Sequence, residues 1–198
     1  MLPSKTDRHL TSGMEWAYRD LLLTLFVAAF ALAVLAMVQK TKPKHDSENT
    51  GTLVVVLHWA IPADADVDLW VEGPGDVPVG YMRRTGKIFD LLHDDRGTSI
   101  EHSVVNTEFA VARSLPEGLY IVNAVLYASW DHKFPVLLDT HIYRASEAGQ
   151  TELYSGTGQL NEVKQEITLV TFRIDANHAL LPGSVIANPP TIPLYAAR

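Results

Sequence analysis

The chain has 198 residues, no cysteine and a formal net charge of −7 at pH 7. Without cysteine it forms no disulfide, no thiolate zinc site and no thiol redox centre. Up to Asp46 there are six Lys/Arg against four Asp/Glu, which leaves ten against nineteen in the rest. The later part is therefore strongly acidic, which argues against nucleic-acid binding, because proteins that bind nucleic acids neutralise phosphates with clustered Lys and Arg.

The N-terminal region contains the longest apolar run. Residues 1–16 are polar and predict an irregular or partly helical lead-in. From Leu21 to Val38 every residue except Thr24 is apolar, a length that nearly matches the ~30 Å hydrocarbon core of a bilayer at 1.5 Å rise per residue. The run is also longer than the core of a secretory signal. We expect a transmembrane helix over residues 17–39, with an orientation that the balanced flanking charges leave open.

An acid stands at the start of this run. Asp20, Thr24, Ala28 and Ala31 follow one another at intervals of four, four and three, so they share one face of a helix. Small residues such as the two alanines allow close helix packing, and a hydroxyl near a carboxylate can help to coordinate a cation or a proton-carrying water. Two interpretations are open: an ion-carrying seam, or an acid that caps the helix N-terminus in the headgroup region.

Residues 15–38 (EWAYRDLLLTLFVAAFALAVLAMV) resemble the transmembrane helix of the flagellar stator B subunit (MotB) and its relatives TolR and ExbD. The resemblance rests on Tyr18, Asp20, Thr24 and the Leu/Phe/Ala-rich span. It implies that Asp20 carries H⁺ or Na⁺ and that two copies stand inside a pentameric ring of a multi-span MotA/TolQ/ExbB-like protein. It also implies a bacterial inner-membrane protein with a cytoplasmic N-terminus and a periplasmic or extracellular C-terminal domain.

After a linker at residues 40–51, the hydrophobic pattern changes to period two. Turn signals such as EGPGD, DDRG and SGTG separate short apolar runs, and we expect strands in these runs: residues 53–59, 67–71, 79–82, 87–92, 102–105, 108–112, 119–127, 136–143 and 166–174. Residues 52–179 therefore predict an antiparallel β-sandwich. Residues 180–198 contain four prolines and predict an extended tail or a segment that covers an edge. The expected fold is mainly β, with one N-terminal transmembrane α-helix and a soluble antiparallel β-sandwich.

Two groups of acidic residues lie in the β region. Asp64, Asp66 and Asp68 alternate along the chain, so an extended backbone points their carboxylates to one side. Together with Asp94 and Asp95 they could supply oxygen ligands for Ca²⁺, which takes six to eight. The alternative is an ordinary acidic loop in which Asp side chains bond to their own backbone. The spacing excludes an EF-hand.

A second resemblance covers residues 57–127. Trp59, DVDLWVEGP (66–74), DDRG (94–97) and GLYIV (118–122) are similar to the motifs of a bacterial β-sandwich domain of poorly known function. This resemblance implies the fold and an extracytoplasmic interaction role, but no enzymatic activity.

Catalytic motifs are weak, and we expect no enzyme. The chain has no G-x-S-x-G and no phosphate-binding glycine loop, and six histidines of the β region lack metal-binding spacing: His58, His93, His102, His132, His141 and His178. Two hypotheses remain. One is an ion-driven motor subunit that acts as a dimer and hands motion to an envelope target, and the other is a membrane-tethered β-sandwich that binds a ligand or protein. Beyond the transported ion and Ca²⁺, no cofactor is expected.

Overall fold

The structure is a computed structural model, and it describes residues 16, 18–29, 52–60, 63–101, 105–146 and 149–195. The chain divides into two compact units, Met1–Ser47 and Glu48–Arg198. The first unit is helical at Trp16 and over residues 18–29.

The predicted transmembrane helix is wrong. Among the residues that the structure describes, no helix is both long and apolar enough to cross a membrane. This finding overturns the transmembrane part of the expected fold and the inner-membrane placement that depended on it. Residues 17 and 30–39 of the predicted span lie outside the described residues.

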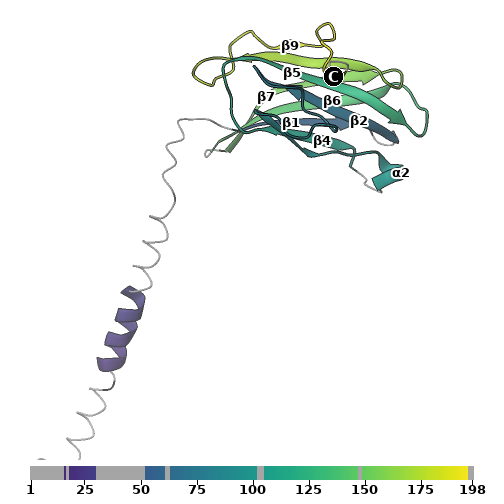
Figure 1. The fold of residues 1–198 in the computed structure, drawn as a ribbon. Helices are drawn as coiled ribbons and strands as arrows, with labels where there is room; N and C mark the ends of the chain where they lie inside the picture. The colour runs from purple at the N-terminus through teal and green to yellow at the C-terminus, as the bar shows by residue number, and fades with distance from the viewer. Residues whose placement is uncertain are drawn as a thin grey trace, which may run out of the picture. The chain divides into compact units, whose positions relative to one another are not determined.

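The second unit consists of two antiparallel sheets that lie face to face (Figure 1). One has five strands in the order β3-β4-β1-β6-β7, and the other has four in the order β2-β5-β8-β9. The elements are β1 (Thr52–Trp59), β2 (Ala65–Glu72), β3 (Phe89–His93), α2 (Thr98–Glu101), β4 (Thr107–Ala112), β5 (Gly118–Ser129), β6 (Val136–Ser146), β7 (Gly149–Leu160), β8 (Glu166–Ile174) and β9 (Ile186–Ala187). This part agrees with the predicted antiparallel β-sandwich.

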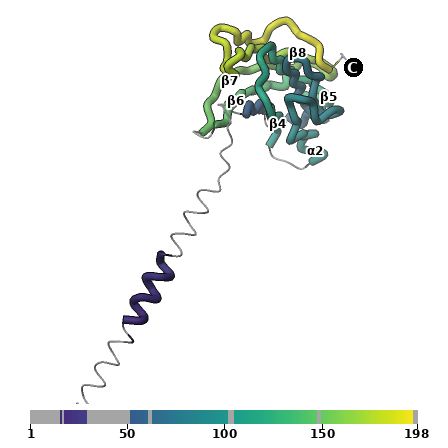
Figure 2. Tube along the Cα trace, turned by 60° about the vertical axis from the view of Figure 1, so that its left-hand side comes forward, coloured from purple at the N-terminus to yellow at the C-terminus, as the bar shows by residue number. Residues whose placement is uncertain are grey.

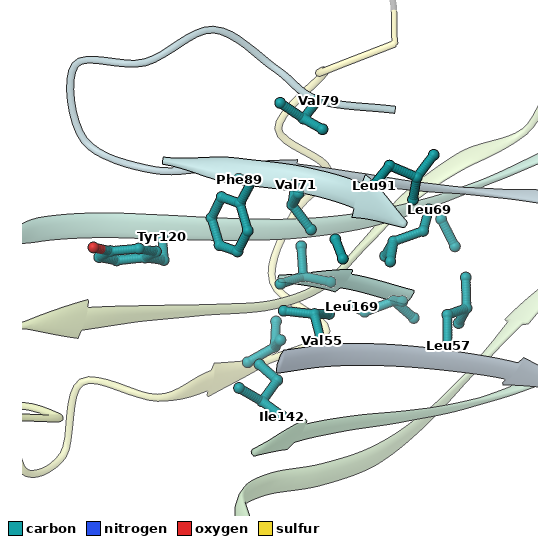
Figure 3. Close-up of a cluster of buried hydrophobic side chains, with 14 of the residues drawn as sticks. Val55, Leu57, Leu69, Val71, Val79, Phe89, Leu91, Tyr120, Ile142 and Leu169 are labelled. Carbon is teal, nitrogen blue, oxygen red and sulfur yellow. The ribbon is translucent and has the colours of Figure 1, made fainter. Parts of the chain in front are cut away.

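The core between the sheets follows the period-two pattern. On β1, Leu53, Val55, Leu57 and Trp59 are buried, while the residues between them are partly exposed. Figure 3 shows apolar side chains from both sheets meeting in this layer, among them Val55 and Leu57 from one sheet and Leu69 from the other. Each such side chain contributes about 1.5–3 kcal/mol by leaving water. Packing in this layer sets the position of the two sheets relative to each other, and therefore determines which strand edges of one sheet lie near those of the other.

A segment near the C-terminus covers the outer face of the four-stranded sheet. Glu166 Oε1 accepts hydrogen bonds from the backbone N–H groups of Leu194 (2.8 Å) and Tyr195 (2.9 Å). Asn123, the polar exception in the apolar run of β5, donates from Nδ2 to the carbonyl of Ile192 at 2.7 Å. Leu194 is buried beside Trp70 in a second, smaller apolar cluster. The segment runs in yellow along one side of the domain in Figure 2.

Three details of the strand prediction are wrong. Residues 79–82 form isolated bridges rather than a strand, since Val79 pairs with Val71 and Gly80 pairs with Arg83. Val105 is not in a strand, and residues 102–104 lie outside the described residues. SGTG, read as a turn, lies inside β7.

Candidate functional site

Three carboxylates meet where an edge of one sheet lies against the other sheet. β2 is the first strand of the four-stranded sheet, and it lies against β4 of the five-stranded sheet. Asp68 comes from β2, Asp94 from the loop that follows β3, and Glu108 from β4. One carboxylate oxygen from each lies within 4.8 Å of the other two. We call these three residues the carboxylate cluster.

Glu108 is the innermost member of the cluster. It pairs with Leu57 across the sheet, so its side chain points into the sandwich, and it is 0% exposed. Its Oε2 accepts a hydrogen bond from the backbone N–H of Leu69 at 2.6 Å, whereas Oε1 accepts none from any described residue. Burial, together with Asp68 and Asp94, raises the pKa of Glu108 well above its ordinary value, although the Leu69 N–H opposes this.

Two further aspartates lie beside the carboxylate cluster. Burial and the negative charges of Asp94 and Asp95 raise the pKa of Asp66 to about 6, and Arg96 and Lys164 oppose the shift. Asp95 is fully buried and its Oδ1 accepts a hydrogen bond from Gly97 N at 2.9 Å. Asp66 Oδ1 and Asp95 Oδ2 have no hydrogen-bond partner in the described part of the chain. This edge thus concentrates buried negative charge.

Asp64 takes a different role from the one predicted. Its Oδ1 accepts a hydrogen bond from Ser99 N at 3.0 Å, and its Oδ2 accepts one from Ser99 Oγ. The residue therefore holds the short helix α2 and does not join the carboxylate cluster. Of the five aspartates predicted to bind Ca²⁺, the structure brings Asp68 and Asp94 together and places Asp66 and Asp95 next to them.

The sequence reasoning missed Glu108 because the strand pattern of β4 is misleading. In TEFAVA, the large residues Phe109 and Val111 suggest the inner face, which would turn Glu108 outward. The structure has the opposite arrangement: Ala110 and Ala112 are buried with Glu108, and Phe109 and Val111 are partly exposed. The sequence did offer one signal: Glu108 shares a strand face with Ala110 and Ala112, and alanines are small enough to leave room for a carboxylate.

The opposite side of the sandwich ends in a different kind of edge. β7 is the last strand of the five-stranded sheet and lies against β8 of the other sheet. It has 12 residues, pairs with β6 along one side, and is largely exposed. The side chain of Asn188 donates from Nδ2 to the carbonyl of Thr157 at 3.2 Å. We call this side of β7 the open edge.

The other sheet edges are covered or short. At β3, Leu91 N donates to Arg84 O (2.7 Å) and Gly86 N donates to Phe89 O (2.8 Å). At β2, Val71 exchanges two backbone hydrogen bonds with Val79, at 2.9 and 2.8 Å. β9 has two residues. β7 is therefore the longest sheet edge left without a backbone partner within the described ranges.

A groove lies beside the open edge. It is lined by residues of β6, β7, β8 and the segment after β9, none of which carries a charge: Leu137, Leu138, Thr157, Gly158, Gln159, Ile167, Thr168, Asn188, Pro189 and Thr191. Exposed Leu137 gives the groove an apolar part, and the hydroxyl and amide groups supply hydrogen-bonding partners.

Two histidines of the β region, His58 and His141, make side-chain contacts but do not form a metal group. His141 Nδ1 lies 2.7 Å from Glu152 Oε1, and its Nε2 lies 3.3 Å from Asp139 Oδ2. The hydrogen bond with Glu152 raises the pKa of His141, burial lowers it, and Asp139 raises it further. His58 Nδ1 lies 2.6 Å from Thr107 Oγ1. Over the described residues, the group that could hold a metal is the carboxylate cluster.

The residues predicted to carry an ion belong to the first unit. Asp20, Thr24 and Ala28 are helical, and Thr24 Oγ1 donates to the backbone carbonyl of Asp20 at 2.9 Å. Ala31 lies outside the described residues. An ion-carrying role for Asp20 and Thr24 stays a prediction.

No family model, curated protein or solved structure matches the chain. The stator-like and β-sandwich resemblances, the partner ring and the motor role therefore also stay predictions.

Proposed function

We propose that the β-sandwich is a non-catalytic protein-binding module that adds an extended segment of a partner protein to the open edge of β7. The observation that carries this proposal is the contrast between the long, uncovered edge of β7 and the covered edges of β2 and β3. An exposed strand edge presents N–H and C=O groups that can pair with another chain. Strand addition of this kind is a recurring mode of peptide recognition.

The direction of the backbone groups on β7 supports pairing. Thr157 O accepts a hydrogen bond from Asn188, so it points away from β6. In an antiparallel strand the N–H and C=O of one residue point to the same side, and the side alternates along the chain. Ser155, Thr157 and Gln159 therefore offer their backbone groups to the open edge, and Gly156 and Gly158 bond to β6. A partner strand would displace the Asn188 side chain from Thr157 O.

The groove indicates the chemistry of the partner. Its lining carries no charge and combines Leu137, Ile167 and Pro189 with hydroxyl and amide groups. Charged side chains would be desolvated there without an opposite charge. The surface therefore suits an extended segment with neutral side chains, alternately apolar and polar, as the two sides of a strand require.

A peptide selection on the purified full chain tests the proposal. Random 12-residue peptides, which match β7 in length, are displayed and selected for binding to the native chain. The affinity of the selected peptides is then measured for the native chain and for two variants. Thr157→Pro removes an edge N–H and should weaken binding at least about tenfold, because proline cannot donate and is tolerated only on strand edges. Thr157→Val is the matched control, since it keeps the N–H and the shape, and it should bind like the native chain.

Three outcomes would contradict the proposal. The selection could yield no binder, or yield peptides that bind Thr157→Pro as well as the native chain. Alternatively, the chain could self-associate in a way that Thr157→Pro abolishes, which would assign the open edge to a second copy instead of a partner peptide. Sedimentation velocity of the native chain and both variants separates this last case.

A further inference from the structure

We propose that Asp68, Asp94 and Glu108 bind one Ca²⁺ ion that links the two sheets of the sandwich. This inference concerns the edge opposite to β7 and goes beyond the binding of a partner strand. It rests on the mutual distances of the three oxygens, on an unpaired oxygen of a fully buried glutamate, and on the all-oxygen chemistry of the group.

The distances suit a shared cation. Oxygens bound to Ca²⁺ lie about 2.3–2.6 Å from the ion, so two ligands are separated by at most roughly twice that distance. The three carboxylate oxygens lie within 4.8 Å of one another, inside this limit. They come from β2, β4 and the loop after β3, and β2, β3 and β4 each contribute side chains to the core.

The unpaired oxygen of Glu108 points to a missing partner. A buried ionised carboxylate is costly unless it is paired and hydrogen-bonded. Glu108 is 0% exposed, receives one backbone N–H at Oε2 and none at Oε1 from the described residues. The residue lies beside two other carboxylates, which add repulsion. A divalent cation would satisfy Oε1 and cancel that repulsion at once.

Other carboxylates of the same domain show how this fold treats an acid without a cation. Glu166 Oε1 accepts hydrogen bonds from Leu194 N, Tyr195 N and Asn123 Nδ2. Asp76 accepts hydrogen bonds from the backbone N–H of Val77 at Oδ1 and from that of Ile88 at Oδ2. Glu108 is more deeply buried than either and has fewer donors. Arg84 lies 3.8 Å from Asp94, but its side chain is 49% exposed and meets the outermost member of the cluster.

The ligand type selects the metal. Carboxylates are hard oxygen ligands, which suit Ca²⁺ and Mg²⁺ better than metals that prefer thiolate or imidazole. Mg²⁺ keeps several waters in a strict octahedron, whereas Ca²⁺ accepts six to eight oxygens in flexible geometry. Asp66 Oδ1 and Asp95 Oδ2 are further buried oxygens beside the group. Such an oxygen-rich, dehydrated position favours Ca²⁺.

The consequence would be a stabilised edge. β2 and β4 belong to different sheets and are joined here by the Leu69–Glu108 hydrogen bond. An ion held by Asp68 and Glu108 would tie the same two strands, and Asp94 would bring in the loop of residues 94–97. Since the unfolded chain does not present these ligands together, binding would add directly to the free energy of unfolding.

The test uses the full chain after treatment with EDTA. Calcium binding is measured by isothermal titration calorimetry, and the melting temperature is measured with and without millimolar Ca²⁺. We expect one ion per chain and a higher melting temperature with Ca²⁺. Asp94→Asn and Glu108→Gln should each weaken binding at least about tenfold, since even partners outside the ligand shell matter by 10–100-fold. Glu152→Gln, an exposed glutamate on β7 at the opposite edge of the five-stranded sheet, is the matched control and should bind normally.

The behaviour of Glu108→Gln without calcium separates loss of a ligand from failure to fold. The variant removes a carboxyl group whose ionised form burial and two neighbouring carboxylates destabilise, so it should melt at the same or a higher temperature than the native chain in EDTA while losing the calcium response. No calcium-dependent shift in the native chain would overturn the proposal. So would equal shifts in all three variants, or a response to Mg²⁺ but not to Ca²⁺.

Discussion

The two lateral edges of the sandwich differ in what happens to their backbone hydrogen-bonding groups. At the β2 edge, backbone groups are taken by Val79 and by the buried carboxylate of Glu108. At the β7 edge, the Asn188 side chain reaches one carbonyl, and Thr157, Gly158 and Gln159 line the groove. Closing an edge with an acid concentrates negative charge and creates the need for a cation, whereas an edge left open keeps backbone groups available for a partner.

The largest difference between the edges should appear when each is overpacked at a glycine. A Cβ at Gly80, beside the β2 edge, would lie 2.5 Å from the Trp70 ring, a rigid neighbour in the smaller apolar cluster. A Cβ at Gly158 of β7 would meet the terminal Cδ2 of Leu169 at 2.7 Å. We expect Gly80→Ala to lower the free energy of unfolding by about 1–3 kcal/mol, and Gly158→Ala by less, because the end of a leucine can rotate away.

Urea unfolding of the two alanine variants measures this difference. Equal losses, or a larger loss for Gly158→Ala, would show that the β2 edge is not the more tightly packed of the two.

A smaller effect concerns the loop that covers the β2 edge. Burial opposes ionisation of Asp76, but the N–H groups of Lys87, Ile88 and Val77 outweigh it and lower the pKa of Asp76 below its ordinary value of 3.8. A lowered pKa in the folded state stabilises the protein above the ordinary pKa, and this stabilisation is lost as the pH falls through the folded value.

Asp76→Asn should therefore lower the free energy of unfolding by about 1 kcal/mol at pH 7, a modest loss because the carboxylate is partly exposed. The loss should be smaller below pH 4. Urea unfolding at pH 7 and pH 3 gives both numbers. A cost that does not shrink at the lower pH would contradict the role assigned to the ionised carboxylate.

The smallest effect is expected at the open edge itself. Asn188 has a backbone φ of 44°, a conformation that glycine also adopts, so Asn188→Gly should remove the side chain from Thr157 O with little strain. Peptides selected on the native chain should bind this variant a few-fold more tightly, because they no longer compete with the amide. Unchanged or weaker binding would argue that Asn188 belongs to the recognition surface rather than blocking it.

Much of the β-sandwich could be predicted from the sequence, because burial imposes period two where large and polar residues alternate. β1 is the clearest case, with Leu53, Val55, Leu57 and Trp59 on one face. β7 was missed because its residues are mostly small or polar, and Gly156 and Gly158 imitate a turn. An exposed edge strand needs few apolar residues, so the strand that offers the open edge carries the weakest pattern.

The carboxylate cluster was predictable in part. DVDL and the double aspartate of DDRG indicated two segments with converging acids, and Asp68 and Asp94 do meet. The third member depends on which face of β4 is buried, and that is decided by packing between sheets rather than by the strand's own composition. Asp64 shares the alternating pattern, yet Ser99 of α2, which is distant in sequence, holds it elsewhere.

The predicted membrane span failed for a different reason. The apolar composition and length of residues 17–39 predict a membrane-spanning helix, but no described helix has both the length and the apolar character that a crossing requires.

Hydrogen–deuterium exchange of the full chain with and without Ca²⁺ tests the contrast between the edges most directly. The Leu69 amide, which bonds to Glu108, should exchange more slowly with Ca²⁺, and so should its neighbours on β2 and β4. The amides of Ser155, Thr157 and Gln159 should exchange at an unchanged rate. No calcium effect at Leu69, or equal slowing along β7, would contradict the view that one edge is closed by a cation and the other stays open for a partner.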